Sequence, residues 1–152
     1  MMLTLDFKKQ LLQTCKKIIT ERMENANKAM QAAQEAANGE DKSSAGDKYE
    51  TSRAMGHRDR DMYARQLVEA KNELQKLERI SIGPVDFVKH GSLLLANETI
   101  YFISTGIGKM EINNKTIMAI SKESPIAQAM LGKRLDEEFT FNKNQWKITI
   151  LI

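Results

Sequence analysis

The chain has 152 residues, of which 41% are hydrophobic and 28% are charged, a composition that excludes an intrinsically disordered protein. The formal net charge is only +3, so overall charge does not identify a partner. A single cysteine, Cys15, excludes an internal disulfide framework, and two histidines, His57 and His90, are too few to suggest a structural zinc site. No apolar run approaches the roughly 18 residues of a membrane span, and the first residues lack a signal-peptide core. We therefore expect a cytoplasmic protein without a membrane partner.

The first half of the chain predicts two long helices. Residues 4–38 contain no glycine or proline and are rich in alanine, glutamine, lysine, glutamate and methionine, which favour helices. Residues 47–79 have a similar composition. In both segments apolar residues recur at alternating steps of four and three, the spacing of a narrow seam between two helices. We therefore expect residues 1–80 to form an antiparallel coiled-coil hairpin with its tip at about 39–48.

The apolar positions also predict how the two helices are aligned. Residues at one level of an antiparallel hairpin have numbers with a nearly constant sum, and several apolar pairs give a sum near 85. These pairs are Met30 with Met55, Met23 with Met62, Ile19 with Leu67, Cys15 with Ala70, Leu11 with Leu74 and Phe7 with Leu77. This alignment predicts a turn between Lys42 and Ser43 and methionine layers in the seam.

The stretch GEDKSSAGDKYE, residues 39–50, joins the two predicted helices and has two interpretations. Its carboxylates are Glu40, Asp41, Asp47 and Glu50. Gly39 suits the end of the first helix, and Ser43, Ser44 or Asp47 suits the start of the second, where acidic groups also favour the positive end of the helix dipole. The second interpretation is that some of these carboxylates take part in chemistry at the tip.

After the second helix the pattern changes to short strands. Pro84 interrupts the helical pattern, and six β-like runs separated by turn signals follow. The runs cover residues 90–96, 99–105, 109–112, 115–121, 138–142 and 146–152. One short helix is predicted among them, with Ser124 as its N-cap, Pro125 at its first position and Gly132 after its end. Residues 81–152 are therefore expected to form a small α+β domain with an antiparallel sheet.

Three segments resemble the bacterial Gre-type transcript-cleavage and elongation factors. The segment ISKESPIAQAMLGKRLDEEFTF (120–141) is similar to the family's Ser-Pro-Leu run, short helix, Gly-Lys-Lys step and acidic turn into a strand. The segment GSLLLANETIYFIS (91–104) resembles the family's Gly-Ser strand and the tyrosine-containing strand that follows it. EDKSSAGDKYETSRA (40–54) is similar to the family's tip motif, Gly-Asp-Leu-Ser-Glu-Asn-Ala-Glu-Tyr. The resemblance implies an N-terminal antiparallel coiled coil followed by an FKBP-like domain with one short helix.

The resemblance also implies a function in bacterial transcription. A factor of this family binds RNA polymerase, inserts its coiled coil into the secondary channel and promotes cleavage of backtracked RNA near the RNA 3′ end. Its tip carboxylates help to hold a Mg²⁺ ion that belongs to the polymerase active site, so no cofactor is bound permanently and the factor is not an enzyme by itself. DNA binding goes with this role, and the closed hairpin favours a monomer.

The tip departs from the family's motif in its second acid. Asp41 can take the place of the family's first acid, whereas Ser44 occupies the place of the second. Asp47 matches only if one extra residue is allowed, and Glu40 is a further candidate. Two interpretations therefore remain: Asp41 with Asp47 or Glu40 forms the catalytic and Mg²⁺-binding set, or the protein is a non-cleaving regulator or inhibitor of the secondary channel.

Four arginines of the second helix are candidate channel contacts. Arg53 and Arg60 are seven residues apart, as are Arg58 and Arg65, so each pair lies on one helical face. With the resemblance, these side chains are expected to contact RNA phosphates or the acidic channel wall, because guanidinium groups bind phosphate and carboxylate well. The alternative is a solvated flank of the coiled coil.

The C-terminal domain carries the predicted polymerase-binding region, Ser124, Pro125, Gly132 and Lys133. Its FKBP-like fold leaves a second class of function open, a peptidyl-prolyl isomerase or chaperone, and a plain coiled-coil adaptor is a third. An isomerase needs an aromatic-lined pocket. The available aromatic residues are Phe87, Tyr101, Phe102, Phe139, Phe141 and Trp146. Strand alternation places some of them on opposite faces, which disfavours such a pocket.

Overall fold

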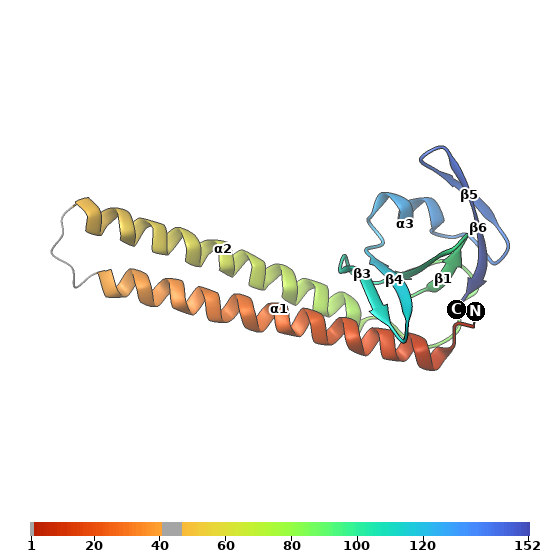
Figure 1. Ribbon diagram of the computed structural model, residues 1–152, viewed down its shortest axis with the longest axis horizontal. Coiled ribbons are helices and arrows are strands. Elements are labelled where there is room, and N and C mark those ends of the chain that lie inside the picture. The colour runs from red at the N-terminus through yellow and green to blue at the C-terminus, as the bar shows by residue number, and fades with distance from the viewer. Residues whose placement is uncertain (1, 41–46) are drawn as a thin grey trace. The chain divides into compact units, whose positions relative to one another are not determined.

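The computed structural model describes residues 2–40 and 47–152 (Figure 1). Two long helices precede six strands and one short helix, which confirms the predicted α+β class. In chain order the elements are α1 (Leu5–Glu40), α2 (Asp47–Glu78), β1 (Leu93–Ala96), β2 (Thr99–Ile103), β3 (Gly108–Ile112), β4 (Lys115–Ile120), α3 (Pro125–Met130), β5 (Glu138–Phe141) and β6 (Asn144–Leu151).

The chain divides into two compact units. Lys17–Leu74 forms one, which we call the hairpin unit. Met1–Lys16 and Gln75–Ile152 together form the other, the sheet unit, so the beginning of α1 and the end of α2 belong with the strands. The sheet unit is therefore built from two pieces of chain, and the residues of the hairpin unit lie between them in the sequence.

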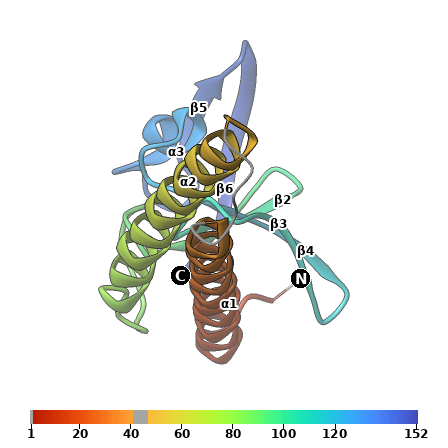
Figure 2. The same ribbon diagram turned by 90° about the vertical axis from the view of Figure 1, so that its left-hand side faces the viewer.

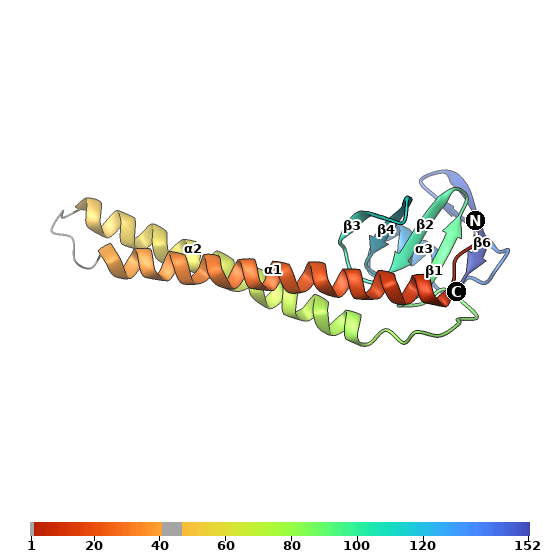
Figure 3. The same ribbon diagram turned by 60° about the horizontal axis from the view of Figure 1, so that its bottom comes forward.

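In the hairpin unit, α1 and α2 run antiparallel and side by side, as Figures 1, 2 and 3 agree in showing. The contacts between the helices align them differently from the prediction. Gly56 faces Ala37, Arg60 Nη1 donates to Gln34 Oε1 at 2.8 Å, and Arg22 lies 3.7 Å from Glu73. The numbers of these paired residues add to 93–95 rather than to 85, so the predicted alignment was wrong.

Small side chains explain the different alignment. A Cβ built on Gly56 would lie 2.9 Å from the Cβ of Ala37, so at this level the two helix backbones approach more closely than any larger side chain would permit. Met55 and Met62, which the heptad pattern placed in the seam, are exposed to 57% and 37%. Cys15 does not belong to the seam either, because it belongs to the sheet unit and its Sγ lies 3.8 Å from the Sδ of Met110.

The six strands form one mixed sheet in the order β3-β4-β2-β1-β6-β5. All neighbouring pairs are antiparallel except β2 with β4, which are parallel. The sequence predicted an antiparallel sheet, and the pairing of β2 with β4 is the one exception to it among the described strands. The parallel pair arises because β4, rather than β3, lies beside β2, while β3 turns back onto β4 at the edge.

Two of the strand connections are tight turns with both residues in the left-handed region. Asn113 and Asn114, between β3 and β4, have φ values of 52° and 64°. Asn142 and Lys143, between β5 and β6, have φ values of 51° and 65°. Such turns match the natural twist of paired strands, and asparagine adopts this conformation more readily than other residues with a Cβ.

The central strands are buried on both faces, which fits their continuous apolar runs LLLA and IYFI. On one face, a core forms between the sheet and α3 from Val88, Leu94, Ala96, Tyr101, Ile103, Ala127, Met130, Phe139 and Ile148. Strand alternation turns Leu93 and Phe102 toward the opposite face, where both are fully buried. Met110, which Cys15 of α1 contacts, lies on that face as well.

The caps predicted for α3 are present. Ser124 is the N-cap, and its Oγ accepts a hydrogen bond from the backbone N–H of Ala127 at 3.4 Å. Pro125 is the first residue of the helix. Gly132 follows the helix with a φ of +83°, a conformation that glycine adopts without a Cβ penalty.

Candidate functional site

Two of the three predicted tip acids are at helix ends. Glu40 is the last residue of α1 and Asp47 is the first residue of α2. Asp41 lies outside the described residues. The side chains of Glu40 and Asp47 are not described either. Their catalytic role therefore stays a prediction that follows from the resemblance.

The predicted Mg²⁺ set has suitable chemistry but no described geometry. Carboxylate oxygens are hard ligands, and Mg²⁺ binds proteins through one or two of them together with phosphates and water. Within residues 2–40 and 47–152, no three His, Cys, Asp or Glu side chains are grouped so that they could hold a metal ion. The predicted site involves Asp41, which is not among these residues, so the sharing of Mg²⁺ with a partner remains untested.

The four predicted arginines differ in their surroundings. Arg60 is held within the hairpin unit, because it donates to Gln34 across the helix pair and to Asp61 Oδ1 at 2.8 Å. The hydrogen bond from Arg60 is the main cause that lowers the pKa of Asp61. Arg53, Arg58 and Arg65 are exposed on α2. The face with Arg58 and Arg65 therefore presents two cations to solvent, whereas on the other face Arg60 already has partners.

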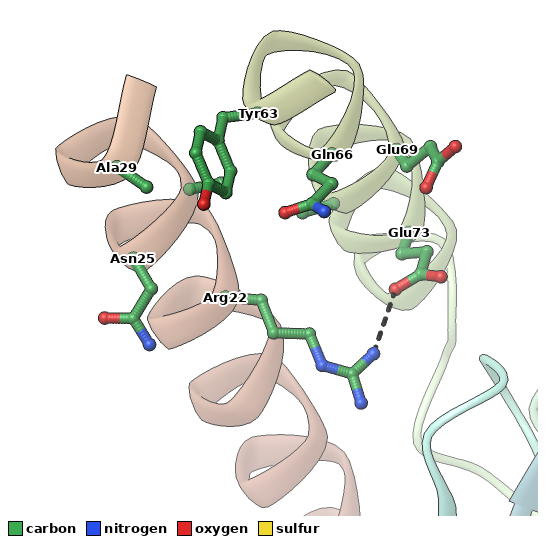
Figure 4. Close-up of a pocket in the computed structure, with 9 residues that line it drawn as sticks. Arg22, Asn25, Ala29, Tyr63, Gln66, Glu69 and Glu73 are labelled. Atoms are coloured by element: carbon green, nitrogen blue, oxygen red, sulfur yellow. Dashed lines mark ion pairs between the residues drawn. The ribbon is translucent and has the colours of Figure 1, made fainter. Parts of the chain in front are cut away.

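A cavity of about 440 Å³ lies between the helices of the hairpin unit (Figure 4). Its lining consists of Arg22, Asn25, Ala26 and Ala29 of α1 and Tyr63, Gln66, Glu69, Ala70 and Glu73 of α2. In Figure 4, Arg22 reaches across the opening to Glu73, and the ring of Tyr63 extends toward α1. This cavity was not predicted from the sequence, although the alanines of both helices were a signal of it.

This cavity is explained by packing. Three alanines facing one another leave space that larger seam residues would fill, and the Arg22–Glu73 pair closes one side of it at 3.7 Å. Exposed ion pairs of this kind contribute little to stability. The remaining lining groups are amides, a phenol and Glu69, which together form no nucleophile–base pair. We therefore treat the cavity as a gap in the helix packing.

The predicted polymerase-binding region in the sheet unit has a structural role. Gly132 N donates to the carbonyl of Val88 at 2.8 Å, and Val88 N donates to the carbonyl of Lys133 at 2.8 Å. Together with the Ser124 cap and Pro125, these bonds fix α3 and the segment after it. Polymerase binding by this region is not tested by these contacts and remains a prediction.

The aromatic residues of the sheet unit pack on one another. Trp146 stacks on Phe139 with ring centroids 6.2 Å apart, and it meets Tyr101 edge to face at 6.4 Å. Phe102 is fully buried, and Phe87 is 40% exposed beside Lys89. Tyr101 and Phe139 belong to the core and Trp146 packs against it, so these three rings contact one another rather than surround an open space. This arrangement disfavours the isomerase interpretation.

The chain was compared with known proteins and solved structures. No protein-family model matches it, and no curated protein matches its sequence. Three solved structures are similar at low identity. GreA factor homolog 1 (Gfh1) of Thermus thermophilus is 14% identical, with a TM-score of 0.34, and the match covers 94% of this chain and 93% of that one. A structure described as the transcription factor Gfh1 is 16% identical, with a TM-score of 0.33 and coverage of 93% of this chain and 91% of that one, and Thermus aquaticus Gfh1 is 16% identical, with a TM-score of 0.34 and coverage of 94% and 92%. In the part of the chain that the structure describes, no helix has the length and apolar character that crossing a membrane requires.

Proposed function

We propose that the protein binds RNA polymerase and regulates transcription elongation by inserting its helical hairpin into the secondary channel. The observation that carries the proposal is the pair of long antiparallel helices, of 36 and 32 residues, whose junction holds the acidic stretch that resembles the Gre-type tip. At about 1.5 Å per residue each helix is roughly 50 Å long. Two helices of this length, connected by an acidic stretch of sequence, suit the delivery of carboxylates into a narrow channel.

The chemistry at the tip would come from Asp41 together with Asp47 or Glu40. These carboxylates would supply oxygen ligands for a Mg²⁺ ion shared with the polymerase, whose chemistry would be to stabilise negative charge on phosphodiester oxygens. The RNA 3′ end is then the group on which the tip acts. The protein supplies ligands only, and the hydrolysis itself belongs to the polymerase.

The second candidate is a non-cleaving regulator or inhibitor of the same channel. It is favoured by Ser44, which stands where the family has its second acid and which is a much weaker Mg²⁺ ligand than a carboxylate. Lys42 and Lys48 beside the acids also reduce the local negative potential. In this case the hairpin occupies the channel without promoting hydrolysis.

Backtracked bacterial elongation complexes with end-labelled RNA test the proposal. We expect the wild-type protein to bind these complexes and to shorten the RNA, and Asp41→Asn, which removes the charge but keeps the size, to slow the shortening by about tenfold or more. Asp59→Asn, an exposed acid of α2, is the matched control and should behave as wild type.

The other outcomes separate the candidates. Tight binding with inhibited elongation and no RNA shortening identifies the non-cleaving regulator. A variant that lacks residues 38–48 should still bind through its other contacts but lose its effect on elongation. If the wild-type protein does not bind polymerase, the proposal is wrong, and turnover of a proline-containing peptide would then support the isomerase.

A further inference from the structure

The sheet unit contains a cavity of about 330 Å³ that is separate from the hairpin unit. Its lining consists of Lys8 from α1, Arg79 and Ser81 after α2, and Gly83, Pro84, Val85, Lys89, His90 and Gly91 from the segment that leads to β1. Three cations and an imidazole thus meet in one cavity from segments far apart in sequence. No acidic residue lines it.

Lys8 is the most buried of these cations. The residue is fully buried, and its Nζ donates one hydrogen bond, to the carbonyl of Gly83 at 3.0 Å. An ammonium group has three donors, so two of them lack a partner in the described part of the chain. Burial, and secondarily the charge of Lys89, lower the pKa of Lys8 to about 8. A buried cation without a counter-ion is costly, which points to an anion that is supplied from outside the chain.

His90 provides an independent second observation. Its Nε2 lies 2.8 Å from the carbonyl oxygen of Lys76, a contact that requires a proton on Nε2. Its Nδ1 is buried and has no hydrogen-bond partner in the structure. Buried polar atoms are nearly always paired, so the unpaired Nδ1 of a residue that lines the cavity calls for a partner that the described chain does not supply.

We propose that this cavity binds a small phosphate-bearing molecule. The charges decide between anion classes: three cations beside an imidazole match a phosphate monoester or a diphosphate better than a single carboxylate, which carries only one charge. Arg79 and Lys89 are exposed members of the lining, whereas Lys8 is fully buried. The unpaired Nδ1 of His90 can accept from a P–OH group or, when the ring is charged, donate to a phosphate oxygen.

The size of the cavity limits the ligand further. A volume of about 330 Å³ lies at the lower end of the range for small-molecule sites. A phosphate or diphosphate with a small organic group fits such a volume, whereas a nucleic-acid strand does not. The proposal does not rest on polymerase binding, because the residues that line the cavity include none of the predicted tip acids, channel arginines or polymerase-binding residues.

Titration of the full-length protein tests the proposal. The probes are inorganic phosphate, pyrophosphate and glycerol phosphate. Their binding is measured by calorimetry and by the shift in thermal unfolding, in a buffer free of phosphate and sulfate. Acetate and chloride at matched ionic strength serve as the reference anions, because added salt alone changes electrostatic interactions. We expect at least one phosphate probe to bind with a sub-millimolar Kd and to raise Tm, while acetate and chloride do neither.

Variants and a spectroscopic signal locate the binding. Arg79→Gln and Lys89→Gln are exposed changes with little risk to folding, and each should weaken phosphate binding by about tenfold. Lys147→Gln, on the exposed face of β6, is the matched control and should bind as wild type. In ¹⁵N spectra, the Nδ1 resonance of His90 should shift on binding. Binding that Arg79→Gln and Lys89→Gln leave unchanged, equal effects of chloride, or an unmoved Nδ1 signal would each overturn the proposal.

Discussion

Gly56 of α2 lies against Ala37 of α1 so closely that a Cβ on Gly56 would be 2.9 Å from the Cβ of Ala37 and 3.3 Å from the carbonyl oxygen of Ala33. Neither neighbour is the end of a flexible side chain, so the helices themselves would have to move apart. We predict that Gly56→Ala lowers the free energy of unfolding by about 1–2 kcal/mol, even though alanine gains about 1 kcal/mol in helix propensity. Circular dichroism at 222 nm during denaturant unfolding measures this change.

A double-mutant cycle gives the control for Gly56→Ala. Ala37→Gly removes the clashing Cβ, so its cost in the Gly56→Ala background should be smaller than in wild type. Ala36→Gly changes an exposed position of the same helix and should cost about 1 kcal/mol in both backgrounds. Equal costs of Ala37→Gly in the two backgrounds would show that the close approach does not determine the alignment.

The burial of Lys8 predicts how stability depends on pH. The pKa of Lys8 is about 8 in the folded state, against an ordinary value of 10.5, so between these values the unfolded chain binds more protons than the folded one. Stability therefore rises as pH increases through 8. The expected gain between pH 7 and pH 9 is about 1 kcal/mol, measured by denaturant unfolding in phosphate-free buffer.

Lys8→Met is the control for this pH dependence. The variant has no titrating group at this position, so it should lack the gain between pH 7 and pH 9 while keeping the contributions of other groups. Parallel stability curves for the two proteins would contradict the assignment. The range stops at pH 9 because Cys15, with an ordinary pKa of 9.0, begins to contribute with the opposite sign above that value.

Cys15 is predicted to be unreactive in the folded protein. Burial raises the pKa of its thiol to about 11, although a hydrogen bond with Ser104 partly offsets the effect, and the side chain is fully inaccessible. Because the thiolate is the reactive form, a disulfide reagent at pH 8 should label Cys15 only as fast as the protein opens. Labelling in denaturant should be complete within minutes, and rapid labelling of the native protein would contradict the buried Cys15–Met110 contact.

The different surroundings of the arginines predict different effects on polymerase binding. If the hairpin enters the channel as proposed, replacing the exposed Arg58 and Arg65 together by alanine should weaken binding about tenfold and reduce its salt dependence. Arg60→Ala should instead lower Tm by a few degrees, because its bond to Gln34 is lost, and should change affinity less. Affinity measured by fluorescence anisotropy at several salt concentrations distinguishes the two cases. A larger loss of affinity for Arg60→Ala would reverse the assignment.

Local sequence patterns were sufficient for the secondary structure. The helix-favouring segments, the turn residues and the Ser124-Pro125 start of α3 each depend on neighbours a few residues away, and all of them appear in the structure. The parallel pairing of β2 with β4 could not be found in this way, because the same strands and turns are compatible with either order. Such pairing is decided by how the whole sheet packs.

Two features could not be predicted by counting apolar positions in the sequence: the alignment of the two long helices and the charged cavity of the sheet unit. Heptad counting gave weight to large apolar residues such as Met55, whereas the structure aligns the helices on Gly56, whose missing side chain carries no weight in such a count. No sequence pattern singled out Lys8. Its Nζ donates to the carbonyl of Gly83, a residue far along the chain, and no local feature of the sequence indicates that contact.

The division of the sheet unit into two pieces has a consequence for how fast the protein folds. Residues before Lys17 and after Leu74 must meet, and closing such a long connection through a disordered chain is entropically slow. The helix pair can form progressively by local contacts, starting where α1 ends and α2 begins. Once Arg22 has reached Glu73, the two ends of that connection are already neighbours. A substitution that delays formation of the helix pair, such as one at Gly56, should therefore slow the assembly of strands that it never touches.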